Sequence, residues 1–362
     1  MSFLILDRVS KSFGKAEVIQ DASLIVEKGE TVAIVGPSGA GKTVLLRLIA
    51  GVYPVDGGDI RLGGRSVRDV PAAERGVGLA FQNFALYPHM SARENVASAL
   101  RARKLPEAEV RRRVGEVTAL LRIDHVLDRK PGQLSNGQKQ RTALARALVS
   151  GATLQMLDDP LRNVDAKLRY EMRFELPRLL MTFNATVLYV TQDYREAMAF
   201  GERVAVLDGG RFVQVARPDA VYREPETLEI AKLFGDPTIN TYPVTPAADG
   251  SVDLFGRRLA LGNRLAALAG RPCTLGLRPE HIAVHPEPGE HRIPMELDAV
   301  TPLSHRAVLL MRTPGGEEVL ALTGEDTVAR LPQHHGTVHV AIDPDRVLAF
   351  DGASALRVAG RP

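Results

Sequence analysis

The sequence predicts an α/β protein with a mostly parallel sheet, followed by a separate and smaller all-β domain. First, a glycine-rich loop at 36–43 lies between an apolar strand pattern and an apolar helix pattern. Second, strand and helix patterns alternate from there to about residue 210. Third, the chain after 234–237 has Pro and Gly spaced among short β-patterned runs, with no long helical segment. At 362 residues, the chain also exceeds one ordinary hydrophobic core.

The composition is that of a soluble globular protein, with 45% hydrophobic and 25% charged residues. The net charge of +3 gives no general case for nucleic acid as a partner. The one basic cluster, within 101–113, is interleaved with Glu107 and Glu109, so we interpret it as a solvated helix face. A single cysteine, Cys273, cannot form an internal disulfide, which suits a reducing compartment and a small buried side chain.

The start of the chain has too short an apolar run for a signal peptide, and no stretch reaches the roughly 18 apolar residues that cross a bilayer. We therefore expect any membrane role to run through partners. Residues 3–30 read as antiparallel strands that lead into the strand at 31–35. Within them, Phe13 is the candidate to contact a nucleotide base, with a place in the core as the alternative.

The glycine-rich loop fills every position of the phosphate-loop pattern G-x-x-x-x-G-K-[S/T]. Its residues are Gly36, Pro37, Ser38, Gly39, Ala40, Gly41, Lys42 and Thr43. The β-branched run 31–35 precedes it, and the helix pattern 44–50, closed by Gly51, follows it. Because the backbone N–H groups and the helix start point at one spot, the loop should bind a polyphosphate, with Lys42 on the β- and γ-phosphates and Thr43 on Mg²⁺. Because the strand pattern before the loop and the helix pattern after it are those that a phosphate loop requires, we disfavour the alternative of a glycine-rich turn that binds no ligand.

Further along, short strands are expected at 60–62 and 77–81, with Gln82 at the end of the second. Helical patterning dominates from 91 to 150, opened by a capping box at Ser91–Glu94 and interrupted at Pro131-Gly132. A buried strand at 153–157 runs into Asp158 and Asp159.

A helix at about 165–183 and a strand at 185–190 follow, and Thr191-Gln192-Asp193 ends that strand. A helix at 194–201, a strand at 203–207 and a hairpin partner complete the α/β unit. In such a unit the ligand is expected at the carboxyl ends of the strands.

Several of these motifs occur in the order and spacing of the ATP-binding cassette (ABC) ATPases, so the chain resembles the ATPase subunit of an ABC transporter. The motifs are Phe13, 36–43, Gln82, 134–138, 157–160, 163–165 and 190–193. The runs 71–78, 85–89 and 277–281 further resemble the ATPases of carbohydrate importers of the maltose type, among which glycerol importers use two distinct ATPases. The resemblance is strong over 3–235 and looser beyond.

The resemblance implies a RecA-like ABC ATPase core with an antiparallel β subdomain, together spanning 1–235 with a helical subdomain at about 83–150. It implies that 236–362 forms an OB-like regulatory domain. Phe13 would then stack on adenine, Gln82 would sense the γ-phosphate or ligate Mg²⁺ and relay that state to the helical insert, and Asp158 would hold Mg²⁺ or its water.

The same resemblance implies a head-to-tail dimer with two shared ATP sites. Its signature residues would clamp the γ-phosphate of ATP bound to the other subunit; they are Ser135, Asn136, Gly137 and Gln138. Asp165 would lie at the dimer seam, and the region 82–90 would receive a cytoplasmic helix of one of two transmembrane permease subunits. A solute-binding protein would be an indirect partner, and the chain would lie on the cytoplasmic face of a bacterial inner membrane.

Three residues depart from the family pattern. Asp159 stands where the family has the Glu that acts as general base, and a displacement of about 1 Å can lower a rate roughly a hundredfold. Gln192 stands where the family has a switch His, and it cannot become cationic, a loss of about 10² to 10³ in rate. Asn136 replaces a glycine, and we expect it to adopt the same left-handed backbone.

The departures predict a site that binds ATP and Mg²⁺ but hydrolyses ATP slowly. Because the signature is nearly intact, we favour a pair with a second, intact ATPase, with a slow homodimer as the alternative. A regulatory module that uses ATP as a structural ligand also stays open. A soluble ABC protein of ribosomes or DNA is disfavoured, because neither a second cassette nor a long coiled-coil insert is visible. The solute, whether sugar, glycerol or another polyol, is not specified by the residues.

Overall fold

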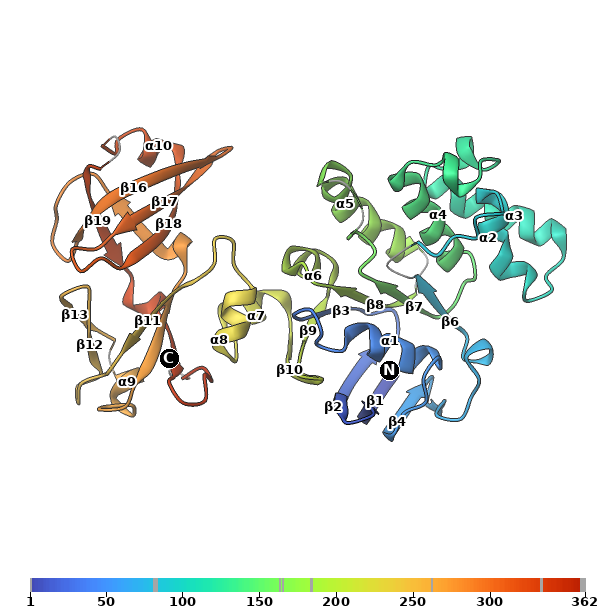
Figure 1. The fold of residues 1–362 in the computed structure, drawn as a ribbon, viewed down its shortest axis with the longest axis horizontal. Coiled ribbons are helices and arrows are strands. Elements are labelled where there is room, and N and C mark those ends of the chain that lie inside the picture. Colours follow the sequence, from blue (N-terminus) through green and yellow to red (C-terminus); the bar gives the residue numbers. More distant parts are fainter. Residues whose placement is uncertain are drawn as a thin grey trace. The chain divides into compact units, whose positions relative to one another are not determined.

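The computed structural model describes residues 2–358 except 81–83, 163, 165, 183–184, 262 and 333–334 (Figure 1). Its internal contacts divide the chain into two units, Met1–Val221 and Tyr222–Pro362. In the described part of the chain, no helix has the length and apolar composition needed to span a membrane.

The first unit is built on a sheet of order β10-β9-β3-β8-β7-β6. All neighbouring strands in it are parallel except the β10–β9 hairpin. Its strands are β3 (Thr31–Val35), β6 (Val77–Ala80), β7 (Leu154–Asp158), β8 (Thr186–Thr191), β9 (Arg203–Asp208) and β10 (Arg211–Ala216). β7 and β8 are buried along their whole length, as strands covered on both faces should be. The mostly parallel sheet is therefore confirmed.

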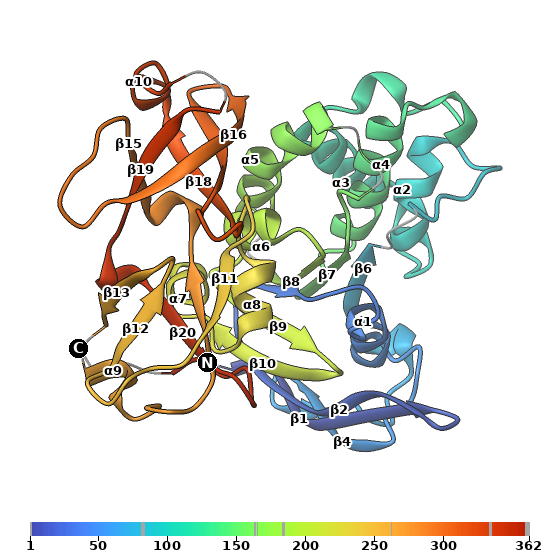
Figure 2. The same ribbon diagram turned by 60° about the vertical axis from the view of Figure 1, so that its left-hand side comes forward.

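A second, antiparallel sheet of order β2-β1-β4-β5 holds the start of the chain. It contains β1 (Ser2–Phe13), β2 (Ala16–Glu27), β4 (Gly57–Leu62) and β5 (Arg65–Ser66). Figure 2 shows β1 and β2 as a long hairpin with α1 (Lys42–Ala50) beside it. Apolar residues of α1 such as Leu45 and Ile49 pack in one core with side chains from both sheets. That core fixes the start of α1, and with it the glycine-rich loop.

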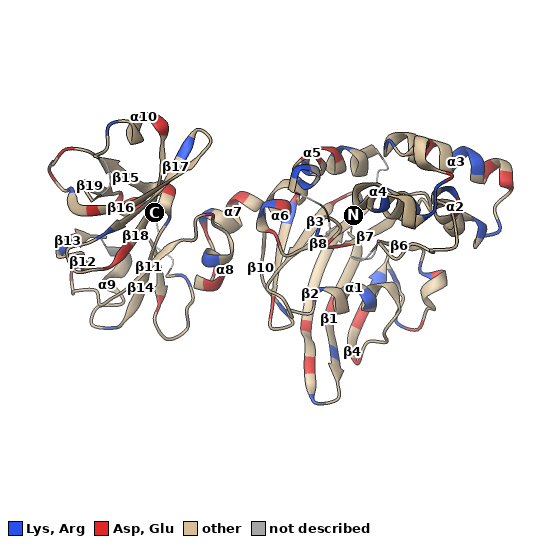
Figure 3. Cartoon of the chain, turned by 45° about the horizontal axis from the view of Figure 1, so that its top comes forward, with Lys and Arg blue, Asp and Glu red and all other residues tan. Residues whose placement is uncertain are grey.

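The helical insert consists of α2 (Ala92–Arg101), α3 (Glu107–Leu120) and α4 (Asn136–Leu148). The predicted capping box is present at the start of α2, where the Glu94 N–H donates to Ser91 Oγ and the Ser91 N–H donates to Glu94 Oε2. Basic and acidic residues both occur on α3 (Figure 3), and Arg112 forms ion pairs with Glu109 and Glu116. The part of the basic cluster at 111–113 lies on a largely solvated face of α3, as expected, whereas Arg101 ends α2 and Arg103 and Lys104 lie in the turn after it. Two further helices, α5 (Ala166–Thr182) and α6 (Tyr194–Phe200), flank β8 in the chain.

The second unit is all-β apart from short helical turns, as predicted. Its sheets have the orders β11-β14-β20, β12-β13 and β15-β19-β16-β17-β18. The strands are β11 (Asn240–Val244), β12 (Ser251–Leu254), β13 (Arg257–Ala260), β14 (Cys273–Leu277), β15 (Ile282–His285), β16 (Ile293–Leu303), β17 (Arg306–Arg312), β18 (Glu318–Gly324), β19 (Thr337–Ile342) and β20 (Leu348–Asp351). The turns α9 (Asn263–Ala266) and α10 (Glu325–Val328) join some of them. Cys273 is buried, and burial raises the pKa of its thiol.

Two helices that the sequence reading did not anticipate, α7 (Pro218–Arg223) and α8 (Leu228–Leu233), precede the β strands of this unit. Arg278 is 2% exposed and donates hydrogen bonds to the carbonyl oxygens of Tyr222 and Phe234. Its guanidinium also lies 3.8 Å from the centre of the Tyr222 ring. These contacts and the division at Val221 group residues 222–235 with the β domain. The domain boundary that the sequence predicts, between 235 and 236, stays a prediction.

Candidate nucleotide-binding site

The carboxyl ends of three adjacent strands bring the predicted site residues together. β3 pairs with β8 in the register Val35↔Thr191, and β8 pairs with β7 in the register Val190↔Asp158. The loop 36–41, the pair Asp158-Asp159 and Gln192 follow these three strands. One edge of the parallel sheet thus carries a cationic loop beside two carboxylates.

Two glycines of the loop are required by its backbone. A Cβ at Gly36 would lie 2.0 Å from the Leu207 carbonyl oxygen, and a Cβ at Gly41 would lie 2.7 Å from Ile19 Cδ1. Gly41 also has a φ of 97°, in the left-handed region that favours glycine. It stands at the start of α1 without any side-chain cap among the described residues, so the first N–H groups of α1 are available to an anion.

Lys42 is 7% exposed and lies against the loop. Its Nζ donates to the carbonyl oxygens of Gly36 at 2.7 Å and Pro37 at 2.8 Å. Burial lowers the pKa of Lys42, and the nearby Asp159 and Asp158 carboxylates oppose that change. A buried ammonium held by two neutral carbonyls is suited to exchange them for phosphate oxygens.

The Thr43 hydroxyl donates a hydrogen bond of 3.1 Å to Asp158 Oδ1. Asp158 is 5% exposed, and burial raises its pKa while the Thr43 hydrogen bond opposes the rise. A hydroxyl and a carboxylate at hydrogen-bond distance are oxygen donors of the kind that Mg²⁺ prefers. Two of the three side chains that the sequence predicts as metal ligands, Thr43 and Asp158, are therefore adjacent and fit that ion.

Asp159 is held in an unusual backbone conformation. Its φ is 47°, a region that Asp enters more readily than most residues, and its N–H donates to the Val190 carbonyl at 2.8 Å. The side chain is almost buried, which raises its pKa, and Arg162 opposes this with Nη1 at 3.7 Å from Oδ2. The carboxylate thus lies beside Asp158 at the strand edge, where a general base is expected.

Gln192 is exposed and directly follows β8. The residue before it, Thr191, belongs to a buried hydrogen-bonded cluster around Glu196. Glu196, 2% exposed, accepts hydrogen bonds from the Thr191 hydroxyl at 2.8 Å and the Tyr189 hydroxyl at 2.9 Å. Thr191 Oγ1 in turn accepts from the Asp193 N–H at 3.0 Å. Sequence reasoning missed Glu196, although an acidic residue next to Ala197 on an apolar helix face was a signal for it.

Phe13 ends β1, and its ring is 43% exposed. The ring meets Tyr53 edge-on at a centroid distance of 5.3 Å, and Lys11 Nζ lies 5.5 Å from its centre. A place in the core is therefore wrong for Phe13, and one face of the ring can accept a stacked base.

The predicted signature residues lie at the start of α4. Ser135 caps this helix, since its Oγ accepts from the Gln138 N–H at 3.3 Å and its N–H donates to Gln138 Oε1 at 3.0 Å. Asn136 is the first residue of α4 and has helical backbone, so the expected left-handed conformation was wrong. The capping box draws residue 136 into the helix, where Asn and Gly are both tolerated. Among the residues that the structure describes, no hydrogen bond or ion pair joins 134–138 to 36–43.

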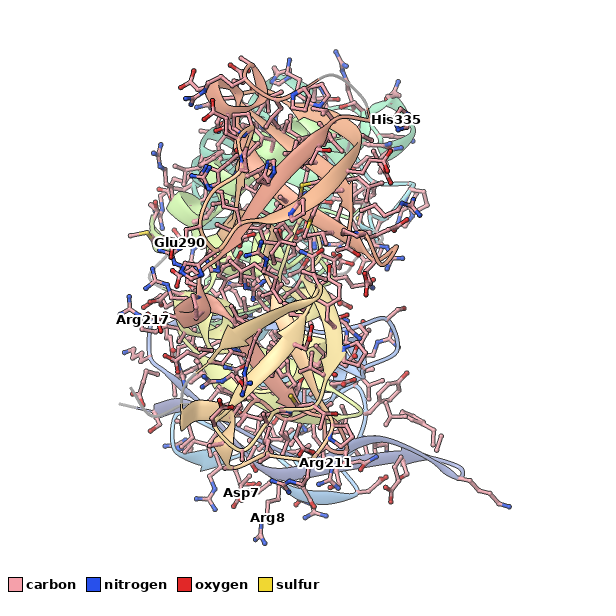
Figure 4. The ribbon with its side chains drawn as sticks, turned by 90° about the vertical axis from the view of Figure 1, so that its left-hand side faces the viewer. Asp7, Arg8, Arg211, Arg217, Glu290 and His335 are labelled. Carbon is pink, nitrogen blue, oxygen red and sulfur yellow. The ribbon has the colours of Figure 1, made fainter. Side chains whose placement is uncertain are left out.

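Gln82 and Asp165 lie outside the described residues, and their predicted roles stay predictions. A separate group of potential metal ligands, Glu296, Asp298 and His335, occurs in the second unit. His335 lies at the surface (Figure 4), and Asp298 forms an ion pair with Arg312 at 3.0 Å. The carboxylate is thus already neutralised by an arginine.

Comparison with known proteins matches residues 19–162 to the family model of the ABC transporter and residues 275–350 to the TOBE domain. The chain is 39% identical to the sn-glycerol-3-phosphate import ATP-binding protein UgpC of Paracoccus denitrificans, over 99% of this chain and 100% of that protein. It is 36% identical to the maltose/maltodextrin import ATP-binding protein MalK of Yersinia pestis, over 99% of this chain and 98% of that one.

Among solved structures, the first unit resembles the ABC cassette MJ0796, captured as a dimer in a post-hydrolysis state with ADP and Pi. The two are 29% identical with a TM-score of 0.54, and the match covers 59% of this chain and 98% of that one. Full-length likeness to import ATP-binding proteins, together with the loop and carboxylates at one sheet edge, settles the family. The chain belongs to the ABC transporter ATPases, among the carbohydrate and polyol importer subunits that carry a C-terminal TOBE domain.

Proposed function

We propose that this chain is the ATP-binding subunit of an importer for a small phosphorylated polyol such as sn-glycerol-3-phosphate, with a sugar as the alternative solute. The observation that carries this is the match over 99% of the chain to several import proteins named for sn-glycerol-3-phosphate. The chain would act at the cytoplasmic face of a bacterial inner membrane, bound to two permease subunits and served indirectly by a solute-binding protein.

The residues present fit ATP with Mg²⁺. The loop 36–41 and Lys42 would hold the phosphates, Thr43 and Asp158 would hold Mg²⁺, and the exposed Phe13 ring would receive the adenine. Bound Mg²⁺ neutralises charge that develops on the phosphate oxygens. Gln82 is proposed to sense the γ-phosphate or to ligate the metal.

Hydrolysis at this chain's own site is proposed to be slow. Asp159 offers an ionisable base, but its side chain is one methylene shorter than Glu, and Gln192 offers a neutral donor in place of a cation. The support is the position of both residues, which directly follow the adjacent strands β7 and β8. Each departure lowers the rate without removing the phosphate or metal ligands.

The signature residues Ser135 to Gln138 are proposed to act on ATP held by a second ATPase subunit, with Asp165 at the seam. The dimeric cassette that this unit resembles supports pairing of two such units. We propose that the partner is a distinct ATPase with an intact base and switch residue, because the departures affect this chain's own site while Ser135 keeps its capping geometry. A pair of identical chains is the alternative outcome.

The test is to express the chain with its permease subunits, with and without a second ATPase. Native mass spectrometry reports which subunits assemble, and vesicles report uptake of glycerol-3-phosphate against maltose. We expect a mixed pair, slow ATP turnover by this chain alone, and uptake of glycerol-3-phosphate. Fast turnover by the isolated chain would contradict the slow site, and a complex with two copies of this chain would contradict the mixed pair.

The variant Asp159→Glu with Gln192→His is the matched test of the slow site. Restoring both residues should raise ATP turnover by about 10² or more, since each change is expected to limit the rate on its own. Single-turnover hydrolysis of radiolabelled ATP measures the chemical step directly. An unchanged rate in the double variant would show that neither residue limits hydrolysis.

A further inference from the structure

The segment 84–90, which leads from the central sheet to α2, begins with a strained backbone. Phe84 has a φ of 60° and Ala85 has a φ of 47°. Residues with a Cβ rarely adopt this left-handed region, and two in succession are rarer, so surrounding groups must hold them there.

Arg146 of α4 supplies the contact that holds this backbone. Its Nη1 donates to the Ala85 carbonyl at 2.7 Å and its Nη2 donates to the Phe84 carbonyl at 3.1 Å. The guanidinium also lies 5.4 Å from the centre of the Tyr87 ring. A planar fork of two N–H donors matches two consecutive carbonyls in a way that a single ammonium cannot.

Asn95 of α2 holds the other end of the segment. It is 0% exposed, and its Oδ1 accepts from the Tyr87 N–H at 2.7 Å. Its Nδ2 donates to the carbonyl oxygens of Tyr87 and Met90, both at 3.1 Å. Between these two anchors the side chains of Tyr87, Pro88 and His89 are exposed. The segment therefore presents an open surface on a backbone that is tied at both ends.

Arg146 and the signature share one helix. Ser135 caps the start of α4, and Arg146 lies eleven residues later, about 16 Å along the helix axis. α4 packs against α2 in a common core through Leu144, Ala145 and Leu148. A shift of the signature end of α4 would thus move the guanidinium and the two carbonyls that it holds.

We propose that Arg146 is a positioning residue that ties the last turn of α4 to segment 84–90, so that the helix links the signature at its start, which clamps the partner's ATP, to the surface offered to the permease. The role of 84–90 as a permease contact rests on the proposed function. The hold of Arg146 on Phe84 and Ala85 does not depend on it.

The local part is tested by hydrogen exchange on the full chain. Arg146→Gln should raise the exchange rate of the backbone amides within 85–90 about tenfold, because the Phe84 and Ala85 carbonyls lose the guanidinium that donates to both of them. Arg141→Gln is the matched control, since Arg141 also lies on α4 and donates to a carbonyl, that of Leu121 at 3.1 Å. It should leave exchange in 85–90 unchanged.

A rescue variant separates positioning from general loss of structure. Ala85 is exposed, and Asn enters the left-handed region more readily than Ala, so Ala85→Asn should recover part of the protection in the Arg146→Gln background. Unchanged exchange in Arg146→Gln, equal changes in Arg141→Gln, or no recovery on adding Ala85→Asn would overturn the hold on this segment.

The proposed link between the signature and segment 84–90 is tested in the assembled transporter. Arg146→Gln should lower solute-stimulated ATP turnover about tenfold and leave nucleotide affinity unchanged, whereas Arg141→Gln should preserve the stimulation. Faster exchange with full stimulation would overturn this link while keeping the local hold. If the unaltered chain binds no permease, the proposed function fails and the link to the permease falls with it, but the exchange result still decides the local hold.

Discussion

The Thr43 hydroxyl donates to the Asp158 carboxylate at 3.1 Å, so the first turn of α1 and the end of β7 meet through the pair assigned to Mg²⁺. Burial raises the pKa of Asp158 in the folded chain. In the pH range between its unfolded and folded pKa values the folded state binds more protons, so stability falls as pH rises through that range. At neutral pH the ionised Asp158 carboxylate therefore destabilises the folded, ligand-free protein.

Asp158→Asn should therefore raise the melting temperature of the nucleotide-free protein and lower ATP hydrolysis by about 10² or more. Asn keeps an oxygen for the Thr43 hydroxyl but is a weak Mg²⁺ ligand. Calorimetry without nucleotide and a Mg²⁺ titration of turnover measure the two effects. Thr43→Val is the control that loses the metal ligand without removing the buried charge, and it should not be stabilised. A lower melting temperature for Asp158→Asn would show that the buried charge of Asp158 does not destabilise the nucleotide-free protein.

The pH dependence of hydrolysis should be set by carboxylates. Burial raises the pKa of Asp159, so turnover should decline on acidification at a higher pH than an ordinary Asp would give. Gln192 does not titrate, whereas Gln192→His should add a second dependence near the ordinary His value of about 6.5. Single-turnover rates across pH 4 to 9, roughly the range spanning both groups, compare the two proteins. Identical profiles would show that residue 192 does not act on the chemical step.

Glu196 should behave differently when replaced by Gln and by Ala. Glu196→Ala leaves the buried hydroxyls of Tyr189 and Thr191 without their acceptor and should lower the free energy of unfolding by about 2 kcal/mol. Glu196→Gln keeps an acceptor, and burial already raises the pKa of this carboxyl, so it should be tolerated at neutral pH. Urea denaturation monitored by circular dichroism measures both. Equal losses for the two variants would mean that the charge itself is needed.

Gln155 is an unusual residue in a fully buried strand. It is 1% exposed, and its Nε2 donates to the Ala152 carbonyl at 3.2 Å, whereas its Oε1 has no hydrogen-bond partner among the described residues. Gln155→Met keeps the shape and removes the unpaired oxygen, but it also removes the Nε2 donor to the Ala152 carbonyl, so the gain in the free energy of unfolding should be at most about 1 kcal/mol. Gln155→Glu is the control of opposite sign, because it adds an unpaired charge. Urea denaturation decides the sign, and destabilisation by Met would show that the hydrogen bond to Ala152 outweighs the cost of the unpaired oxygen.

Elements with strong local patterns could be predicted from the sequence. The strand 31–35 coincides with β3 because an apolar β-branched run ends at the glycine loop. The α2 start was correct because Ser91 and Glu94 form a capping box within four residues. The same pattern, Ser135 with Gln138, was available for α4, and applying it would have placed Asn136 in the helix rather than in a left-handed turn.

What the sequence could not supply depends on contacts between distant segments. The six-residue helices α7 and α8 are too short to show a helical period. Burial of Glu196 and the hold of Arg146 on Phe84 and Ala85 arise only when α6, α4 and the sheet come together. Asp158 and Asp159 were identified, but their raised pKa values follow from burial that no spacing reveals.

The anchoring of Phe234 by Arg278 bears on how the two units can be separated. Phe234 is 0% exposed, and its carbonyl accepts a hydrogen bond from Arg278 of the β domain. A fragment that stops at 235 would lose the guanidinium that holds the Phe234 carbonyl, and a fragment that begins at 236 would leave the buried Arg278 without its Tyr222 and Phe234 acceptors. Proteolysis or cloning aimed at a well-behaved catalytic fragment should therefore cut ahead of Pro218.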